Sequence, residues 1–192
     1  MNRGTRPLSG AVLAGGESRR MGRDKAMLCW KGEPLWLRQK RVLLESGARP
    51  VTVVRKRSQP ALGGEARLLY DTVDDAGPLA GLHAALSACP TDLIAVLAVD
   101  MPQMDAAWFR WLSGFCRPGL GAAVRIPAGF EPLAAIYPRE ALATVTSHLR
   151  LPDLSLQHLV TALVQAQRMV GVPLAASDRH RLLNWNTPDR YE

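Results

Sequence analysis

The sequence is poor in cysteine and has no long apolar run. Its three cysteines, Cys29, Cys89 and Cys116, are far apart, odd in number and not arranged as C-x-x-C. This spacing argues against a disulfide framework and a cysteine zinc site, so we expect a protein of the reducing cytoplasm. No apolar stretch reaches the length of a membrane span, and "MNRGTRPLSG" is too polar for a signal peptide, so we expect no membrane association.

Aromatic residues are also scarce, at 6% of the 192 residues, and no stacking platform such as an RNA-recognition motif is present. The net charge is nevertheless +7 at pH 7, which points to an anionic partner. The tightest basic groups are Arg19, Arg20, Arg23 and Lys25, and then residues 55–57. A small polyphosphate explains the first group better than nucleic acid does. The second group is either part of a site or only a solvated strand end.

Short apolar runs alternate with helical patterns along the chain. The expected strands are residues 8–14, 51–54, 66–70, 93–99, 122–126 and 132–137, and the expected helices are residues 34–46, 81–89, 105–116 and 155–165. Asp105 and Ser155 are the expected caps of the last two helices. This order predicts an α/β fold with a doubly wound, mostly parallel sheet in three α/β/α layers. Because no linker or repeat divides the chain, we expect residues 1–192 to form a single domain.

The segment "AVLAGGESRRMGRDKAML", residues 11–28, sets two glycines and a basic cluster directly behind the first strand. Ligands of an open α/β sheet bind beyond the carboxyl ends of its strands. Gly15 and Gly16 let backbone N–H groups approach an anion, and Arg19, Arg20 and Lys25 supply charge that a triphosphate would accept. The loop is neither a Walker A motif nor G-x-G-x-x-G. A basic surface turn is the alternative, but it explains the coincidence of strand, glycines and charge less well.

Two acids are expected at the same edge of the sheet. Asp100 follows the strand at 93–99, and Asp71 follows the weaker strand at 66–70. Mg²⁺ keeps several waters and needs few protein ligands, so a lone carboxylate among phosphates suits it. Asp100 is therefore the candidate metal ligand, with a turn cap before Pro102 as the alternative.

These motifs resemble a known family. "LAGGESRRMGRDKAML" is similar to the L-A-G-G-x-S-x-R-M-G-x-D-K signature of the molybdenum cofactor guanylyltransferases, and "YDTVDDAGPLAGL", "VDMP", "EPLAAIYP" and "NWNTPDRY" follow in that family's order. The first motif is shared with a wider group of nucleotidyltransferases, and the later ones narrow the match. The resemblance implies a Rossmann-like fold of the nucleotide-diphospho-sugar-transferase type. It also implies transfer of GMP from GTP to Mo-molybdopterin, with formation of Mo-molybdopterin guanine dinucleotide and pyrophosphate.

The resemblance also implies roles for individual residues. The residues that it places in the nucleotide site are Leu13, Ala14, Gly15 and Gly16 in the cradling loop, Lys25 as the phosphate-binding lysine, Asp71 as a GTP-binding acid and Asp100 as the magnesium ligand. The family often has an asparagine at the end of its second strand, where this chain has Val54. Arg20, Lys25 and magnesium on Asp100 would stabilise the leaving pyrophosphate. No strong general base is expected, because the attacking phosphate is already largely dianionic.

The C-terminal motif offers two asparagines for the second substrate. Asn184 and Asn186 could face the pterin, although Asn186 or Thr187 could equally cap a last helix that begins at Pro188. We expect the first half of the chain to bind the nucleotide and the second half the pterin. We also expect a monomer that makes transient contacts with other molybdenum cofactor proteins.

Two rival functions remain at this stage. The same fold could use CTP on molybdopterin, or another nucleotide on a small-molecule phosphate. A different class would be a non-catalytic protein that binds nucleotides or nucleic acid. The presence of Gly15, Gly16, Lys25 and Asp100 together argues against the non-catalytic alternative.

Overall fold

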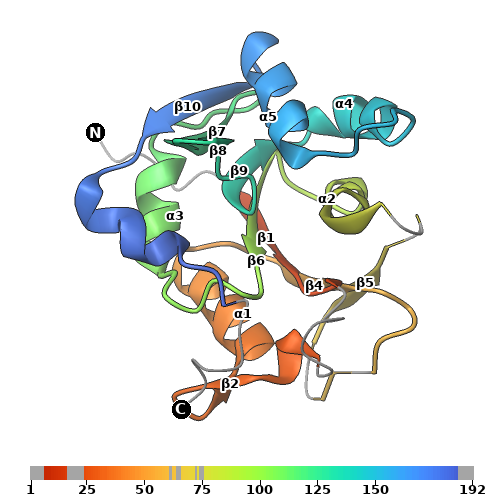
Figure 1. The fold of residues 1–192 in the computed structure, drawn as a ribbon, viewed down its shortest axis with the longest axis vertical. Helices are drawn as coiled ribbons and strands as arrows, with labels where there is room; N and C mark the ends of the chain where they lie inside the picture. Colours follow the sequence, from red (N-terminus) through yellow and green to blue (C-terminus); the bar gives the residue numbers. More distant parts are fainter. Residues whose placement is uncertain are drawn as a thin grey trace.

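A mixed β-sheet forms the centre of the computed structural model, which describes residues 7–16, 24–60, 62–63, 66–71, 73 and 76–185. Its strands are β1 (Leu8–Leu13), β4 (Val51–Arg55), β5 (Leu68–Tyr70), β6 (Leu93–Ala98), β7 (Gly121–Ile126), β8 (Gly129–Phe130), β9 (Ala134–Pro138) and β10 (Met169–Pro173). The strand order is β10-β7-β9-β6-β1-β4-β5, with β8 paired to β7 (Figure 1). A separate hairpin joins β2 (Cys29–Trp30) to β3 (Glu33–Pro34).

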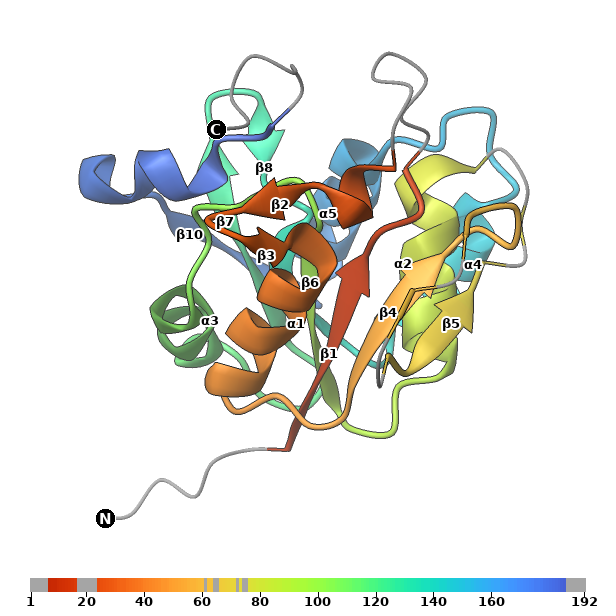
Figure 2. The same cartoon turned by 90° about the horizontal axis from the view of Figure 1, so that it is seen from below.

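Within the described central sheet, the strands other than β8 and β9 run in the same direction. β1 pairs in parallel with β4 and β6, and β4 pairs in parallel with β5, whereas β9 lies antiparallel between β6 and β7. The register sets Leu13 beside Val54 on one side and beside Ala98 on the other. The carboxyl ends of β1, β4, β5 and β6 therefore meet at one edge, which is at the top of Figure 2. The predicted α/β fold with a mostly parallel sheet is confirmed.

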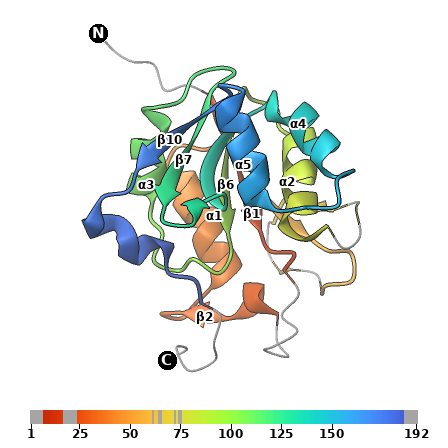
Figure 3. The ribbon, with the colours of Figure 1, turned by 45° about the horizontal axis from the view of Figure 1, so that its top comes forward.

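Helices cover both faces of the sheet (Figure 2 and Figure 3). One face carries α1 (Leu35–Glu45) and α3 (Ala106–Ser113), and the other carries α2 (Gly77–Ser87), α4 (Ala141–His148) and α5 (Leu156–Gln165). Leu43, Trp108 and Phe109 belong to the buried core of the first face, and Leu82 and Leu159 to that of the second. Apolar side chains of β1 are divided between the two cores, with Leu8 and Val12 in the first and Ala11 and Leu13 in the second, which explains why apolar residues occur on both faces of this strand.

Several element boundaries differ from the prediction. α2 begins at Gly77 instead of residue 81, because Gly77 adopts a φ of +54° and Pro78 suits a first turn. The predicted caps are correct: Asp105 accepts a hydrogen bond from Trp108 N and Ser155 accepts one from Gln157 N. α4 and β10 are not expected from the sequence. In the described part of the chain, no helix has both the length and the apolar character to cross a membrane.

Candidate functional site

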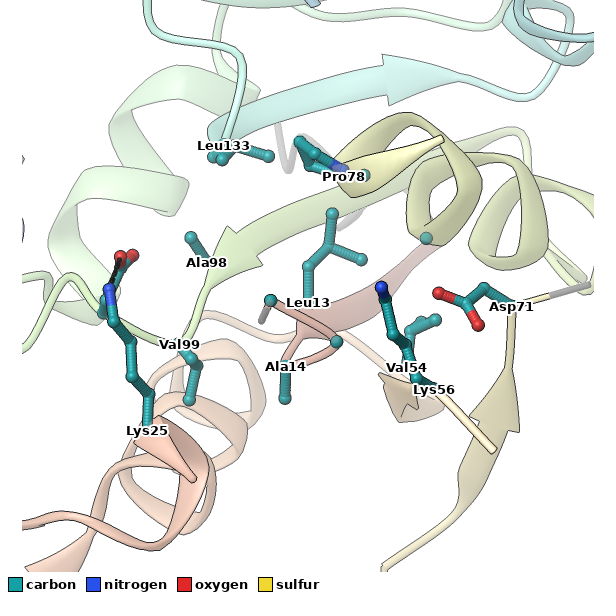
Figure 4. Close-up of a pocket in the computed structure, with 15 residues that line it drawn as sticks. Leu13, Ala14, Lys25, Val54, Lys56, Asp71, Pro78, Ala98, Val99 and Leu133 are labelled. Atoms are coloured by element: carbon teal, nitrogen blue, oxygen red, sulfur yellow. Dashed lines mark hydrogen bonds and ion pairs between the residues drawn. The ribbon is translucent and has the colours of Figure 1, made fainter. Parts of the chain in front are cut away.

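A pocket of about 340 Å³ lies at the carboxyl edge of the parallel strands (Figure 4). It is lined by the residues predicted for the nucleotide site, namely Leu13, Ala14, Gly15, Gly16, Lys25, Asp71 and Asp100. These residues come from four separate segments of the sequence, and the parallel register brings them to one place. Arg20 and Asn186 lie outside the described residues.

The floor of the pocket is the turn that follows β1. Leu13 accepts a hydrogen bond from Val99 N at 3.1 Å, and Ala14 N donates to Val54 O at 2.9 Å, so this turn is fixed to both neighbouring strands. A Cβ atom at Gly15 would lie 3.5 Å from Asp71 Oδ2 and 3.5 Å from Lys56 N. A larger side chain at Gly15 would therefore project among the groups that line the pocket.

Lys25 and Asp100 form an ion pair at one side of the pocket. Lys25 Nζ lies 3.1 Å from Asp100 Oδ2, and both side chains are about one-fifth exposed, at 20% and 21%. Lys25 begins the 3₁₀ helix η1 (Lys25–Met27), and Asp24 caps that helix by accepting a hydrogen bond from Ala26 N at 3.0 Å. A cation and a carboxylate are thus held together at the side of the pocket.

The loop that carries Asp100 is bonded to two distant segments of the chain, α1 and the C-terminal motif. The fully buried Gln39 of α1 donates through Nε2 to Met101 O at 2.6 Å and to Ala98 O at 3.5 Å, on either side of Asp100. Arg38 Nε donates to Pro102 O at 2.7 Å. From the C-terminal segment, Trp185 N donates to Asp100 O at 2.9 Å. These bonds fix the backbone of the loop, while the Asp100 carboxylate pairs with Lys25.

The alternative of a solvated strand end at residues 55–57 is wrong for Arg55. Arg55 is 1% exposed and forms an ion pair with Asp24. Lys56 lines the pocket, and Figure 4 shows its amino group pointing toward Asp71. Arg57 is exposed, with its guanidinium 5.4 Å from the centre of the Tyr70 ring. The burial of Arg55 depends on a carboxylate far away in the sequence, so no local pattern reveals it.

The first turn of α2 forms another wall of the pocket. Gly77, Pro78 and Gly81 line it, and a Cβ atom at Gly81 would lie 3.5 Å from a methyl group of Leu13. The N-terminus of a helix presents unpaired N–H groups and a positive partial charge, both of which favour an anion. The sequence interpretation used this segment, within "YDTVDDAGPLAGL", to narrow the family resemblance and expected the helix at residues 81–89, so it missed this contribution.

The segment "EPLAAIYP" builds the wall opposite the glycine turn. Leu133 lines the pocket, and its carbonyl accepts a hydrogen bond from Ala98 N at 2.8 Å. Glu131 accepts one from Leu133 N at 2.8 Å. Burial raises the pKa of Glu131, and the negative charge of Asp100 raises it further. The buried Tyr137 hydroxyl donates to Pro132 O at 2.8 Å, so this wall is internally braced.

The C-terminal motif reaches the site through its tryptophan. Trp185 is 3% exposed and packs edge-on against Trp30 of β2, with the ring centres 4.4 Å apart. Asn184 is exposed and precedes this anchored residue. The sequence interpretation singled out the asparagines and missed Trp185, whose backbone bond to Asp100 leaves no trace in composition or spacing.

The residues present fit a magnesium ion held mainly by phosphates. Within the described ranges, no group of three or more His, Cys, Asp or Glu side chains could enclose a metal ion. Mg²⁺ bound to a nucleotide needs only one or two protein carboxylates, because phosphates and water fill its other positions. Asp100 meets that need at the side of the pocket.

A parallel-strand edge with a glycine turn, a lysine, two acids and a helix N-terminus defines a nucleotide-binding α/β protein. The family model of the MobA-like NTP transferase domain matches residues 10–178. A "Probable molybdenum cofactor guanylyltransferase" of Opitutus terrae is 53% identical over 185 residues, which cover 95% of this chain and 92% of that protein. The chain therefore belongs to the molybdenum cofactor guanylyltransferase family, whose members are nucleotidyltransferases.

Solved structures share the fold. The crystal structure of molybdopterin-guanine dinucleotide biosynthesis protein A from Archaeoglobus fulgidus has a TM-score of 0.74 at 23% identity, over 94% of this chain and 93% of that chain. The crystal structure of Rv0371c from Mycobacterium tuberculosis, in complex with manganese, has a TM-score of 0.59 at 19% identity, over 90% and 89% of the two chains.

Proposed function

We propose that this protein transfers GMP from GTP to Mo-molybdopterin, forming Mo-molybdopterin guanine dinucleotide and releasing pyrophosphate. The observation that carries the proposal is the placement of Lys25 and Asp100, 3.1 Å apart, in the pocket above the glycine turn. It supports phosphate binding, and membership of the family supplies the substrates.

In this proposal the nucleotide spans the pocket between two charged sides. The turn from Leu13 to Gly16 offers backbone N–H groups, and Lys25 binds the outer phosphates. Asp71 lies across the pocket from Lys25 (Figure 4), so we assign it to the nucleoside end. The N-terminus of α2 adds positive potential between these two sides.

Asp100 would hold a divalent cation, and Mg²⁺ is the ion that its donor chemistry favours. When bound, such an ion neutralises negative charge on the triphosphate. Gln39 and Trp185 keep the Asp100 backbone in place for this task. The manganese in the Rv0371c structure belongs to that protein and supports a divalent metal in this fold.

The transfer itself needs alignment more than acid–base chemistry. An oxygen of the molybdopterin phosphate attacks the α-phosphorus of GTP and forms a new P–O bond, while the bond to the β-phosphate oxygen breaks. The bonding electrons leave with pyrophosphate, whose charge Lys25 stabilises. The attacking phosphate is largely dianionic near neutral pH, so no side chain has to remove a proton. We assign Arg20 to the same charge stabilisation.

The pterin would enter from the side where the C-terminal motif meets the Asp100 loop. The exposed Asn184 precedes Trp185, which is bonded to Asp100 O. We therefore assign Asn184, together with Asn186, to the pterin side of the site. An approach from this side would set the pterin phosphate near the α-phosphorus, in line with the departing pyrophosphate.

We also propose a single nucleotidyltransferase domain that acts as a monomer in the cytoplasm and meets other molybdenum cofactor proteins only transiently. Both apolar cores lie on one continuous sheet, which supports a single unit.

A turnover assay with each of the four nucleoside triphosphates tests the function. The purified protein is incubated with Mo-molybdopterin and Mg²⁺, and both pyrophosphate and the pterin dinucleotide are quantified. We expect both products with GTP alone. Products with CTP alone would make the protein a cytidylyltransferase, and nucleotide binding without any product would indicate a non-catalytic protein.

A further inference from the structure

Arg55 is a buried charge that lies behind the pocket wall and does not line the pocket. It ends β4, is 1% exposed and pairs through Nη2 with Asp24 Oδ2. Among the described residues, its Nε and Nη1 atoms are buried without a hydrogen-bond partner. Burying a guanidinium is unfavourable even when it is paired with a carboxylate, and an apolar residue at this strand end would serve stability at least as well.

The side chain of Arg55 is connected to Lys25 through Asp24. Its partner Asp24 directly precedes Lys25 in the sequence and caps the short helix that Lys25 begins, by accepting the hydrogen bond from Ala26 N. Asp24 is thus held between a buried guanidinium and the first turn of that helix. A three-residue helix has little stability of its own, so its orientation depends on such anchors.

The main chain of Arg55 is bonded to Asp71, on the other side of the pocket. Its carbonyl accepts a hydrogen bond from Asp71 N at 3.1 Å. One residue therefore connects the segment that carries Lys25 with the segment that carries Asp71. Arg55 also balances the charge of Asp24, which would otherwise repel phosphates beside Lys25.

We propose that Arg55 is a positioning residue of the nucleotide site, which acts on phosphate binding through Asp24 by fixing the turn that holds Lys25. This inference rests on the proposed phosphate-binding role of Lys25. In this inference the buried Arg55–Asp24 ion pair serves ligand binding, because stability alone does not explain its presence.

A double variant, Asp24→Asn with Arg55→Met, tests the proposal without changing the net charge. Asparagine can still cap Ala26 N, so the variant removes the tie to β4 and keeps the cap. Because neither partner leaves an unpaired buried charge, it avoids the main risk of the single Arg55→Met variant. Calorimetric titrations with GTP and with GMP are made on this variant, on Lys25→Ala and on the combination of the two.

We expect the double variant to weaken GTP binding about tenfold, the scale of one misplaced charged hydrogen bond. GMP lacks the outer phosphates, so its affinity should change less than about twofold. In the Lys25→Ala background the double variant should add almost nothing, because both changes act through the same lysine. Glu33→Gln, which breaks the exposed pair with Arg41, serves as the matched control and should leave both affinities unchanged.

Three results would overturn the proposal: parent-like GTP binding by the double variant, equal losses for GTP and GMP, or a full additive loss in the Lys25→Ala background. The last two would mark the ion pair as merely structural. Parent-like GTP binding by Lys25→Ala alone would contradict the proposed role of Lys25 itself, and so separates failure of the proposed function from failure of the Arg55 inference.

Discussion

The two ends of the parallel strands differ in the kind of polar groups that they carry and in how these groups are paired. At the amino end, Ser9 N donates to Thr91 Oγ1 at 3.1 Å, and the two hydroxyl oxygens lie 2.9 Å apart. The Cys89 thiol lies 3.2 Å from Ser9 Oγ and donates to Thr91 O at 3.1 Å. These short, uncharged side chains satisfy one another, so this end closes the fold.

At the carboxyl end, the polar groups are charged and face a pocket. Lys25 and Asp100 lie at its side with part of each side chain open to solvent, and Arg55 is buried with two nitrogen atoms unpartnered among the described residues. Such an arrangement is poor for stability and well suited to an anionic ligand that brings its own metal ion. The comparison indicates that the amino end carries stability and the carboxyl end carries function.

The largest effect should come from Asp100→Ala at the carboxyl end. Loss of the carboxylate that we propose as the metal ligand should reduce turnover about a thousandfold or more, while the melting temperature stays near that of the parent. Asp105→Ala is the matched control on the same loop, because it removes the cap of α3. It should lower the melting temperature by the equivalent of about 1 kcal/mol and keep most activity. Steady-state kinetics and thermal unfolding of both variants test this prediction. A folded Asp100→Ala variant that kept its activity would contradict the functional role of the carboxyl end.

Gly15→Val should weaken GTP binding about tenfold or more. A Cβ atom is tolerated at 3.5 Å from its neighbours, but the two methyl groups would extend among Asp71, Lys56 and the phosphates. Gly63→Val is the control, since no atom of the described residues lies within 4 Å of its Cβ position and it is not among the residues that line the pocket. Titration calorimetry measures the GTP affinity of both variants. Equal affinities for the two variants would show that the nucleotide does not approach the turn after β1.

At the amino end, Thr91→Val should affect stability and leave GTP binding unchanged. The substitution keeps the shape of the side chain and removes the acceptor for the buried Ser9 N–H. An unsatisfied buried donor costs about 1–2 kcal/mol, which denaturant unfolding can measure. A clear loss of GTP affinity would show that the two ends are not independent.

The smallest effect concerns the pH dependence at Glu131. Burial raises the pKa of Glu131, so the folded state binds its proton more tightly than the unfolded state. Its contribution is therefore most favourable below the unfolded pKa and is lost as the pH rises through the folded pKa. Glu131→Gln should raise the melting temperature slightly at pH 8, and the gain should vanish near pH 4. A gain that is equal at both pH values would rule out ionisation as its cause.

The site was largely predictable because it depends on strands that are easy to recognise. The apolar runs of β1, β4 and β6 are unambiguous, and their parallel order brings Gly15, Asp71 and Asp100 to one edge. The supporting contacts were not predictable, since Gln39, Arg55 and Trp185 act through partners far away in the sequence.

The elements that the sequence interpretation missed have weak local signals. β10 is an edge strand that contains Gly171 and ends at Pro173, two residues that indicate a loop when read alone. The helix α4 carries two threonines and a serine in eight residues, which blurs its apolar face. Tertiary packing decides both cases.

A crystal structure with GTP and Mn²⁺ bound would test the central claim most directly. The account predicts the triphosphate over the turn at Gly15 and Gly16, with Lys25 on its outer phosphates and the metal ion on the Asp100 carboxylate. The Lys25–Asp100 pair should then have separated to receive them. A nucleotide bound elsewhere, or bound at this edge with Asp100 still paired to Lys25 and the metal ion distant, would contradict it.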